Sequence, residues 1–340
     1  ALPTAEKLSV LAALLDESFK YPSMEFKHAW EQLLFNDEHS YGTSGYQGRR
    51  VYETWMQHRD WINTAKETAQ KYTQRALNCI IENINAKRDK LVVFNPTALE
   101  RDERIQYQGE EFIVHNIPPF GYKSMELPLK INKESEKKKI AVPPIIENKY
   151  YLLKFSKTGA IESIYDKQLK RELLRKGLCA NEYIYTKDNN ESFVSPLTAE
   201  FEVLENKHSI TVISRMKETV SGAELIQSVT LPENEKRIEI DNSILHISDM
   251  FNKNRYYRYA YYGFPVDVKD CKRYCNTSGG DVLEYAKDIT GHGTDVYMPS
   301  YEWCAAQNDE FGIAARHLDS HLVEFDHIHS DKTDYNNAGS

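Results

Sequence analysis

One short stretch of the chain gathers side chains that can do chemistry. Residues 36–45 read Asn-Asp-Glu-His-Ser-Tyr-Gly-Thr-Ser-Gly, so the carboxylates of Asp37 and Glu38 stand beside the imidazole of His39 without any apolar period. Carboxylates and imidazoles exchange protons and bind metal ions. A loop of this composition between rigid helices commonly carries catalytic or binding residues. The alternative is a polar connection between two helices that binds nothing.

Other types of site have weaker signals in the sequence. There is no Gly-x-Ser-x-Gly elbow for a nucleophilic serine and no His-Glu-x-x-His zinc motif, and the glycine-rich stretch 278–281 is too short to cradle phosphate. Histidines crowd the C-terminal third of the chain at His292, His317, His321, His327 and His329. The pair His327 and His329 could reach a metal ion, and exposed loop histidines are the alternative.

Cysteine usage indicates a reducing compartment. The chain has five cysteines, Cys79, Cys179, Cys271, Cys275 and Cys304. Their odd number and low density imply no disulfide framework, so we expect a cytoplasmic protein. Cys271 and Cys275 could bind a metal only with partners that the sequence does not identify, and structural thiols are the alternative.

Length and composition exclude some classes of partner. The chain has 340 residues, of which 41% are hydrophobic and 28% charged, with a net charge of −8. A negative balance argues against broad nucleic-acid binding, which needs basic surface to displace counterions from phosphate. No apolar run approaches the roughly 20 residues of a membrane span. The chain opens on Ala-Leu-Pro-Thr without an initiator Met, so we expect a processed or excised piece.

Helical periodicity dominates the first part of the chain. Apolar residues recur every three or four positions within residues 4–16, from Phe26 to Leu34, and from Arg49 to about Ala86 without any Pro or Gly. This pattern predicts a three-helix bundle over residues 1–88. We expect the bundle to bury Trp30, Trp55 and Trp61, because tryptophans at helical spacing are usually core residues.

After Lys90 the period changes from that of a helix to that of strands. Short strands are expected at 91–94, 104–107, 111–114, 123–127, 150–155, 161–165, 200–205, 209–216, 224–231, 237–245, 256–268, 303–306 and 312–315. A hairpin should form around Thr158 and Gly159, and the charged run 132–139 should be a solvated loop. The spacing predicts an antiparallel β-sandwich over residues 89–340.

Five ordered motifs carry a resemblance to a known family. They are residues 29–42 (Ala-Trp-x-x-Leu-Leu-Phe-Asn-Asp-Glu-His-Ser-Tyr-Gly), Val93–Pro96, Ile117–Tyr122, Gly159–Lys167 with Arg171–Leu174, and Phe264–Val268. Together they resemble the middle and C-terminal regions of glycoside hydrolase family 38, the zinc-dependent α-mannosidases. No single motif is decisive, and the likeness depends on their order.

The resemblance implies a fold and a chemistry. The family has a catalytic α/β barrel, then a three-helix bundle, then β-sandwich domains of the galactose-mutarotase-like supersandwich type. His39 matches a zinc ligand contributed by the bundle, while the barrel supplies the other ligands and the aspartate nucleophile of a retaining hydrolase. The partner would be a mannose-containing oligosaccharide. The barrel motif is not in this chain, and Ser40-Tyr41-Gly42 departs from the commoner residues after the loop histidine.

These departures limit the expected activity. One ligand of a four-ligand zinc site should bind zinc weakly, and we expect no catalytic residue in this chain and no turnover by the chain alone. Two other functions stay open, a carbohydrate-binding or structural β module and an assembly role in which the long helix forms a homo-oligomer. The sequence does not identify the residues that contact substrate.

Overall fold

The computed structural model describes eleven stretches of the chain. They are residues 1–37, 49–84, 90–126, 137–186, 198–217, 223–246, 259–277, 279–288, 298–318, 320 and 322–325. The chain divides into two compact units, residues 1–132 and 133–340. The boundary expected between residues 88 and 89 stays a prediction. Within the described helices, none combines the length and apolar character that crossing a membrane requires.

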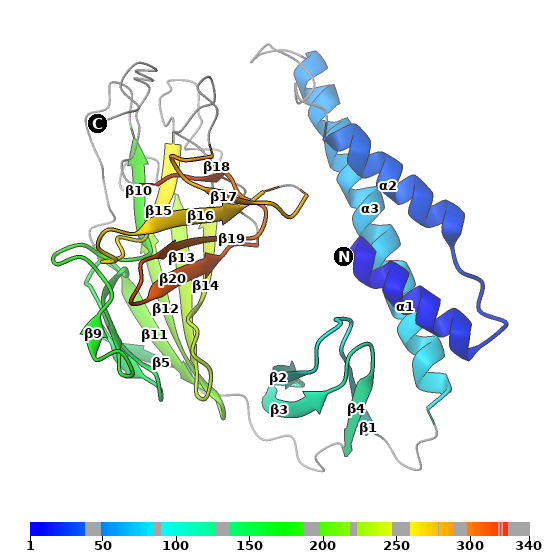
Figure 1. Ribbon diagram of the computed structural model, residues 1–340, viewed down its shortest axis with the longest axis horizontal. Coiled ribbons are helices and arrows are strands. Elements are labelled where there is room, and N and C mark those ends of the chain that lie inside the picture. Colours follow the sequence, from blue (N-terminus) through cyan, green and yellow to red (C-terminus); the bar gives the residue numbers. More distant parts are fainter. Residues whose placement is uncertain are drawn as a thin grey trace. The chain divides into compact units, whose positions relative to one another are not determined.

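Three helices form the start of the first unit, as Figure 1 shows. They are α1 (Leu2–Leu15), α2 (Ser23–Asn36) and α3 (Arg49–Glu82). Pro3 lies in the first turn of α1, where its missing N–H costs nothing. Both α1 and α2 pack along α3. The predicted helices are therefore confirmed to within a few residues at each end.

Small side chains bring these helices close together. The two apolar clusters of the bundle contain alanines from all three helices: Ala5, Ala12, Ala29, Ala65, Ala69 and Ala76. Phe26 and Tyr72 add the large buried rings, whose centroids are 5.4 Å apart in an edge-to-face contact. The core of the bundle therefore depends on close approach of the helix backbones.

The expected burial of the tryptophans is wrong for two of the three. Trp55 is 62% exposed and Trp30 is 38% exposed, while Trp61 is half-buried. The buried stripe of α3 runs through His58, Ala65, Ala69 and Tyr72. Trp55 lies to one side of this stripe, so a period of three to four in the sequence was not sufficient to assign it to the core.

Two small sheets complete the first unit. Strand β1 (Lys90–Phe94) pairs with β4 (Tyr122–Glu126), and β2 (Arg101–Tyr107) pairs with β3 (Glu110–Ile117). The first strand is tied to the helices, because Phe94 packs against the cluster that contains Leu8, Phe19 and Ile80. All four strands were predicted from the sequence.

Two antiparallel sheets form a sandwich in the second unit. One has the strand order β14 (Glu239–Leu245), β13 (Glu224–Pro232), β12 (Ser209–Lys217), β11 (Glu200–Glu205) and β5 (Lys137–Ile140). The other has the order β6 (Ile145–Glu147), β7 (Tyr151–Phe155), β8 (Ile161–Asp166) and β9 (Arg171–Glu172). One core contains Leu153 and Ile164 of the smaller sheet with Val212 and Val229 of the larger. A sandwich is therefore confirmed for these strands, while the range 89–340 predicted for it stays a prediction.

The hairpin around Thr158 and Gly159 is also confirmed. It joins β7 to β8, and Gly159 adopts a φ of +87°, which a residue with a side chain rarely does. A Cβ atom at Gly159 would lie 3.0 Å from the Cβ of Ser214. Glycine is therefore required here both by conformation and by space.

The charged run 132–139 was expected to be a solvated loop, and for its last residues this is wrong. Lys137–Lys139 belong to β5, which pairs with β11 at the edge of the five-stranded sheet. Lysines suit an edge strand because their charges prevent another chain from pairing there. Residues 132–136 of the run lie outside the described part of the chain.

The rest of the second unit is a third sheet and two short ribbons (Figure 1). The sheet has the order β17 (Val282–Glu284), β16 (Lys272–Asn276), β19 (Trp303–Gln307) and β20 (Gly312–Arg316). The ribbons pair β10 (Glu182–Thr186) with β15 (Tyr259–Gly263), and β18 (Met298–Pro299) with β21 (Leu322–Val323). The sequence did not predict β16, whose residues Lys-Arg-Tyr-Cys-Asn are largely polar.

Candidate functional site

His39, the residue predicted to bind zinc, lies outside the described residues, as do its neighbours 38 and 40–48. The structure describes the two helix ends from which this segment departs. Helix α2 ends at Asn36, and the N–H of Asp37 still donates to the carbonyl oxygen of Leu33 at 3.0 Å. Helix α3 begins at Arg49. The position of the chain two residues before His39 is therefore set by the end of a packed helix.

A histidine on α3 holds this end of α2. The Nδ1 atom of His58 lies 3.0 Å from the Oδ1 atom of Asn36, and the His58 side chain is 8% exposed. The His58 ring meets Trp61 edge-to-face at 4.9 Å, and Phe35 contacts Trp61 at 5.8 Å. The contacts join the last turn of α2 to α3. The sequence analysis missed this role of His58, although a histidine within an apolar stripe is a signal that a polar partner is needed.

The described residues alone do not form a metal centre. Within the described ranges, no three His, Cys, Asp or Glu side chains lie together as a metal ion would require. A zinc site normally needs three or four protein ligands. A zinc site of four ligands that includes His39 would therefore take at least one further ligand from residues that the structure does not describe or from outside this chain.

Of the C-terminal histidines, one can be placed. The Nε2 atom of His317 lies 2.8 Å from the hydroxyl oxygen of Ser300, which in turn donates to the Trp303 carbonyl oxygen. His317 therefore lies half-buried directly after β20, where its N–H donates to the carbonyl oxygen of Glu302 at 2.9 Å. His292, His321, His327 and His329 lie outside the described residues, so a metal site at His327 and His329 stays a prediction.

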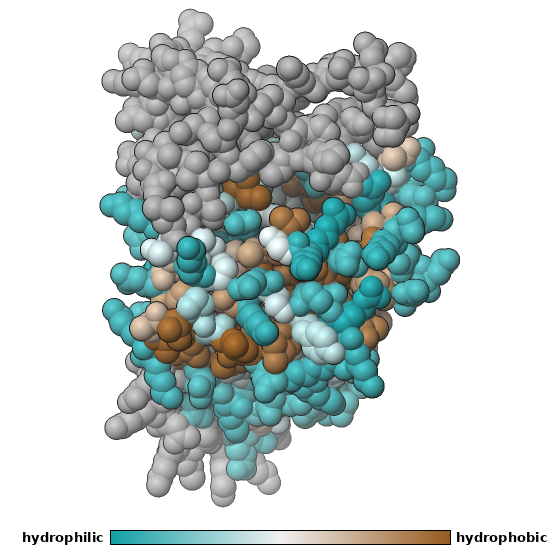
Figure 2. All heavy atoms as spheres, turned by 90° about the vertical axis from the view of Figure 1, so that its left-hand side faces the viewer, coloured by the Kyte–Doolittle hydropathy of each residue, from teal (hydrophilic) through white to brown (hydrophobic). Residues whose placement is uncertain are grey.

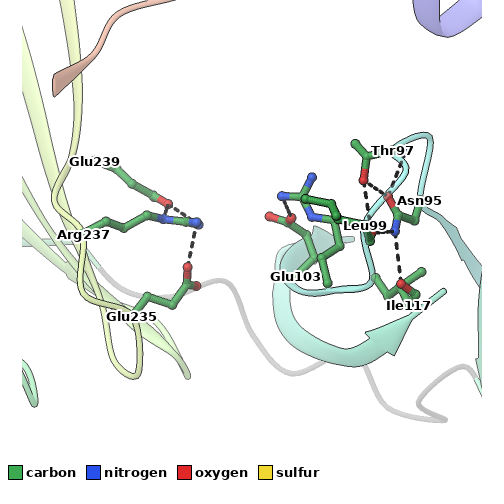
Figure 3. A network of polar contacts seen from close by, with 9 residues as sticks. Asn95, Thr97, Leu99, Glu103, Ile117, Glu235, Arg237 and Glu239 are labelled. Atoms are coloured by element: carbon green, nitrogen blue, oxygen red, sulfur yellow. Dashed lines mark hydrogen bonds and ion pairs between the residues drawn. The ribbon is translucent and has the colours of Figure 1, made fainter. Parts of the chain in front are cut away.

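Motifs that carried the resemblance stabilise turns of the fold through side-chain hydrogen bonds. Asn95 is buried and its Nδ2 donates to the carbonyl oxygens of Leu99 at 2.7 Å and Ile117 at 3.1 Å (Figure 3). Its Oδ1 accepts from the N–H and the hydroxyl of Thr97, at 3.0 and 2.6 Å. One side chain therefore holds the turn after β1 to the end of β3.

Asp166 closes the turn after β8 in a similar way. Its Oδ1 accepts from the N–H groups of Gln168 and Leu169 at 2.8 and 2.9 Å, and its Oδ2 lies 3.0 Å from the Nζ of Lys236. Burial raises the pKa of Asp166, but the hydrogen bond from Leu169 and the Lys236 ammonium outweigh burial, so the pKa lies below its ordinary value. The carboxylate is charged and fully engaged, which suits a structural role better than proton transfer.

Two motifs far apart in the sequence lie side by side. The N–H of Arg175 donates to the carbonyl oxygen of Pro265 at 2.8 Å, and the N–H of Asp267 donates to that of Leu173 at 2.8 Å. Leu174 and Val266 pair between these bonds. Two motifs that the resemblance singled out, Arg171–Leu174 and Phe264–Val268, are therefore joined by backbone pairing.

A shallow hollow of about 250 Å³ lies in the second unit, and two of its carboxylates lie close to basic side chains. Its lining includes Glu147, Glu205, Lys207 and Glu233. Glu147 lies 2.7 Å from the Nζ of Lys167, and Glu233 lies 3.5 Å from the Nδ1 of His208. Asn148, also in the lining, donates to the backbone of Pro232 and Glu235. These contacts connect β6 with the turn after β13, as expected of structural residues.

The turn after β13 has its own charge cluster. Arg237 lies 2.7 Å from Glu235 and 2.8 Å from Glu239, so its guanidinium bridges two carboxylates (Figure 3). The three side chains are between a third and a half exposed, and such pairs contribute little to stability. The cluster therefore carries no clear sign of a ligand site.

Comparison with known proteins shows a likeness in the β region. Residues 146–303 match the model of the glycosyl hydrolases family 38 C-terminal domain. A solved structure of a protein in glycosyl hydrolase family 38 from Enterococcus faecalis superposes with a TM-score of 0.60 at 14% identity. The superposition covers 91% of this chain and 48% of that one. A search of curated proteins found no match.

The two comparisons support different statements, one about sequence family and one about fold. The family match confirms the predicted resemblance for residues 146–303, and the likeness to the solved structure shows that the fold extends over most of the chain. The chain spans about half the length of its structural relative, and the part of it that the structure describes contains no α/β barrel. The described part of the chain thus has three helices followed by β-sheets, and over 91% of the chain this fold is similar to part of a family 38 protein.

Proposed function

We propose that this chain is the middle and C-terminal part of a retaining, zinc-dependent α-mannosidase that hydrolyses terminal α-mannosides of glycans. The observation that carries the proposal is the match of residues 146–303 to the family 38 C-terminal domain. The helices in front of the matched region support it, since the solved family 38 relative has a similar fold over 91% of this chain. A galactose-mutarotase-like supersandwich, a cytoplasmic location and a homo-oligomer are parts of the same proposal.

His39 is proposed to supply one zinc ligand from the segment between α2 and α3. The contact between His58 and Asn36 supports this role, because it fixes the end of the helix from which the segment departs. Bound zinc would act as a Lewis acid that holds sugar hydroxyls. At least one of the other ligands of a four-ligand site would come from outside the described residues, because these form no cluster of three metal-binding side chains.

The chemistry proposed for the whole enzyme uses two carboxyl groups that this chain does not supply. In a retaining hydrolase one carboxylate attacks the anomeric carbon while a carboxylic acid protonates the leaving oxygen. The chain described here would instead form part of the wall of the active site, positioned by α2 and α3.

The proposal predicts that the isolated chain is inactive. The test is hydrolysis of an aryl α-mannoside by the purified chain with added zinc, compared with the His39→Ala variant of the same chain. Equal and background-level rates are expected. Turnover by the unmodified chain above that of the variant would overturn the assignment of the catalytic groups to the missing part.

A second function, a carbohydrate-binding module, is favoured by aromatic side chains on the surface of the second unit, which we call the β unit (residues 133–340). Tyr301 is 61% exposed, and Phe264 and Tyr165 are also exposed. On the face drawn in Figure 2, apolar side chains reach the surface between hydrophilic ones. A glycan array probed with the isolated chain distinguishes the two functions, because binding without the barrel would favour the module.

A further inference from the structure

Two cysteines face each other across neighbouring strands of the third sheet. Cys275 of β16 is the direct partner of Cys304 of β19 in an antiparallel pair. Directly opposed residues in such a pair have their side chains on the same face of the sheet. Leu283 lies beyond Cys275 and Ala315 beyond Cys304 in the same row, so small or apolar side chains flank the two thiols.

The register that opposes these cysteines is held at both ends of the strand pair. At one end the Oδ1 of Asn276 accepts from the N–H groups of Glu302 and Trp303, both at 2.9 Å. At the other end the Nδ2 of Asn308 donates to the carbonyl oxygen of Lys269 at 2.9 Å. A shift of one residue would break both anchors, so the two thiols stay opposite each other.

The geometry of opposed residues suits a disulfide. The Cα atoms of such pairs are about 4.5 or 5.5 Å apart, depending on whether the pair is hydrogen-bonded. A disulfide needs Cα atoms about 4.4–6.8 Å apart. Both cysteines are free thiols here. In the pairing of the described strands, no other two cysteines are opposed.

The two thiols differ in solvent exposure, and their raised pKa values slow their oxidation. Cys275 is 1% exposed, whereas Cys304 is partly exposed. Burial, and after it the neighbouring Cys275 thiol, raises the pKa of Cys304 to about 11. Burial also raises the pKa of Cys275. At neutral pH little thiolate is present, so reaction requires an oxidant in excess and proceeds slowly.

We propose that Cys275 and Cys304 form a reversible disulfide site that responds to small-molecule disulfides such as oxidised glutathione. The Cys304 thiolate, the more accessible one, attacks a sulfur of oxidised glutathione, forms a mixed disulfide and releases one glutathione thiolate. The Cys275 thiolate then attacks the Cys304 sulfur and releases the second glutathione. Two protein thiols are oxidised and one oxidised glutathione is reduced to two thiols, which take up the two protons.

The sequence allows a direct test by peptide mapping. Trypsin cleaves after Arg273, Lys287 and Arg316, so residues 274–287 and 288–316 form two peptides that contain one cysteine each. The folded chain is incubated with oxidised glutathione, the remaining thiols are alkylated, and the digest is analysed without reduction. The proposal expects the two peptides joined by a disulfide, a loss of about 2 Da in the joined species, and separation by dithiothreitol.

Matched variants test the order of the two steps. In Cys275→Ser the mixed disulfide at Cys304 should accumulate because the resolving thiol is absent, whereas Cys271→Ser should behave like the unmodified chain. Cys275→Ala gives a second test if serine at this buried position prevents folding. The oxidised chain should also unfold at a temperature higher by roughly 5 °C, since the bond closes a loop in the unfolded state.

Two results would overturn the proposal. One is that the chain without substitutions keeps glutathione on Cys304 and the two peptides are not joined. This result would mean that the two thiols lie too far apart to form a disulfide. The other is a chain whose two cysteines are both recovered as free thiols after prolonged incubation at pH 9, where thiolate is more abundant.

Discussion

The helical bundle and the β unit are stabilised by different kinds of interior. In the bundle, alanines let three helices approach closely around the buried rings of Phe26 and Tyr72, while Trp30 and Trp55 are exposed. In the β unit, buried Asn and Asp side chains bridge strands that are distant in sequence. Asn181 is an example, because its amide pairs with that of Asn242 at 2.7 and 3.0 Å. The comparison teaches that the bundle depends on close approach of its helices, whereas the second unit adds to its apolar core polar bonds between segments distant in sequence.

The largest effect is expected where a buried polar bridge is removed. Asn181 is fully buried, and its backbone carbonyl oxygen also accepts from the Nε2 of Gln227 at 2.9 Å. Asn181→Ala should destabilise the β unit by about 3 kcal/mol, because it leaves the Asn242 amide unpaired and puts alanine at a φ of +55°. Urea unfolding followed by circular dichroism measures this change.

A double-mutant cycle serves as the control for this bridge. Asn242→Ala alone should also destabilise, and the double variant should lose less than the sum of the two. Additive losses would mean that the amide pair does not stabilise the β unit, which would remove the main evidence for the difference between the two regions.

The second effect tests volume in the bundle. Ala69 is 1% exposed between the helices, so Ala69→Leu should force them apart and cost about 2 kcal/mol. Gln70→Leu, at the exposed neighbouring position, is the matched control and should leave the unfolding midpoint nearly unchanged. Equal midpoints for the two variants would show that the bundle is loosely packed.

A smaller effect is expected in the loss of stability at acidic pH. The pKa of Asp166 in the folded chain lies below its ordinary value of 3.8, so its contribution to stability is present above pH 3.8 and is lost as the pH falls through the lower value. Asp166→Asn cannot titrate. Its midpoint should therefore fall less than that of the unmodified chain between pH 5 and pH 2, as measured by thermal unfolding. Parallel pH curves for the two proteins would contradict the bridge from Asp166 to Lys236.

The smallest effect is expected at Trp55. Because this side chain is 62% exposed, Trp55→Ala should change stability by less than about 0.5 kcal/mol. Guanidinium unfolding measures it, with Phe26→Ala, at a buried ring, as the contrasting variant. A loss near that of Phe26→Ala would mean that Trp55 is covered in the protein after all.

The sequence predicted regular elements well because their periods are local properties. The bounds of α1, α2 and α3 follow from apolar spacing, and Gly159 marked its hairpin. The exposure of Trp55 could not be predicted, since the apolar spacing of one helix does not show which of its apolar residues the partner helices cover. Strand β5 was missed because three consecutive lysines read as solvent-exposed, and only pairing with β11 makes them a strand.

The candidate site was less accessible to sequence reasoning than the fold. The resemblance pointed to His39, but the residues that fix the neighbouring helix end, Asn36 and His58, were not recognised. Their contact joins positions 22 residues apart, which periodicity cannot detect. Likewise the opposed thiols of Cys275 and Cys304 depend on a strand, β16, whose polar sequence gave no signal.

The most direct test of the central claim is the zinc content and activity of the full-length parent enzyme with His39→Ala. The account predicts that this variant loses bound zinc and hydrolysis of an aryl α-mannoside together, while His28→Ala, at an exposed position on α2, retains both. A folded His39→Ala parent that keeps its zinc and its activity would contradict the proposal that this chain contributes a ligand to the active site.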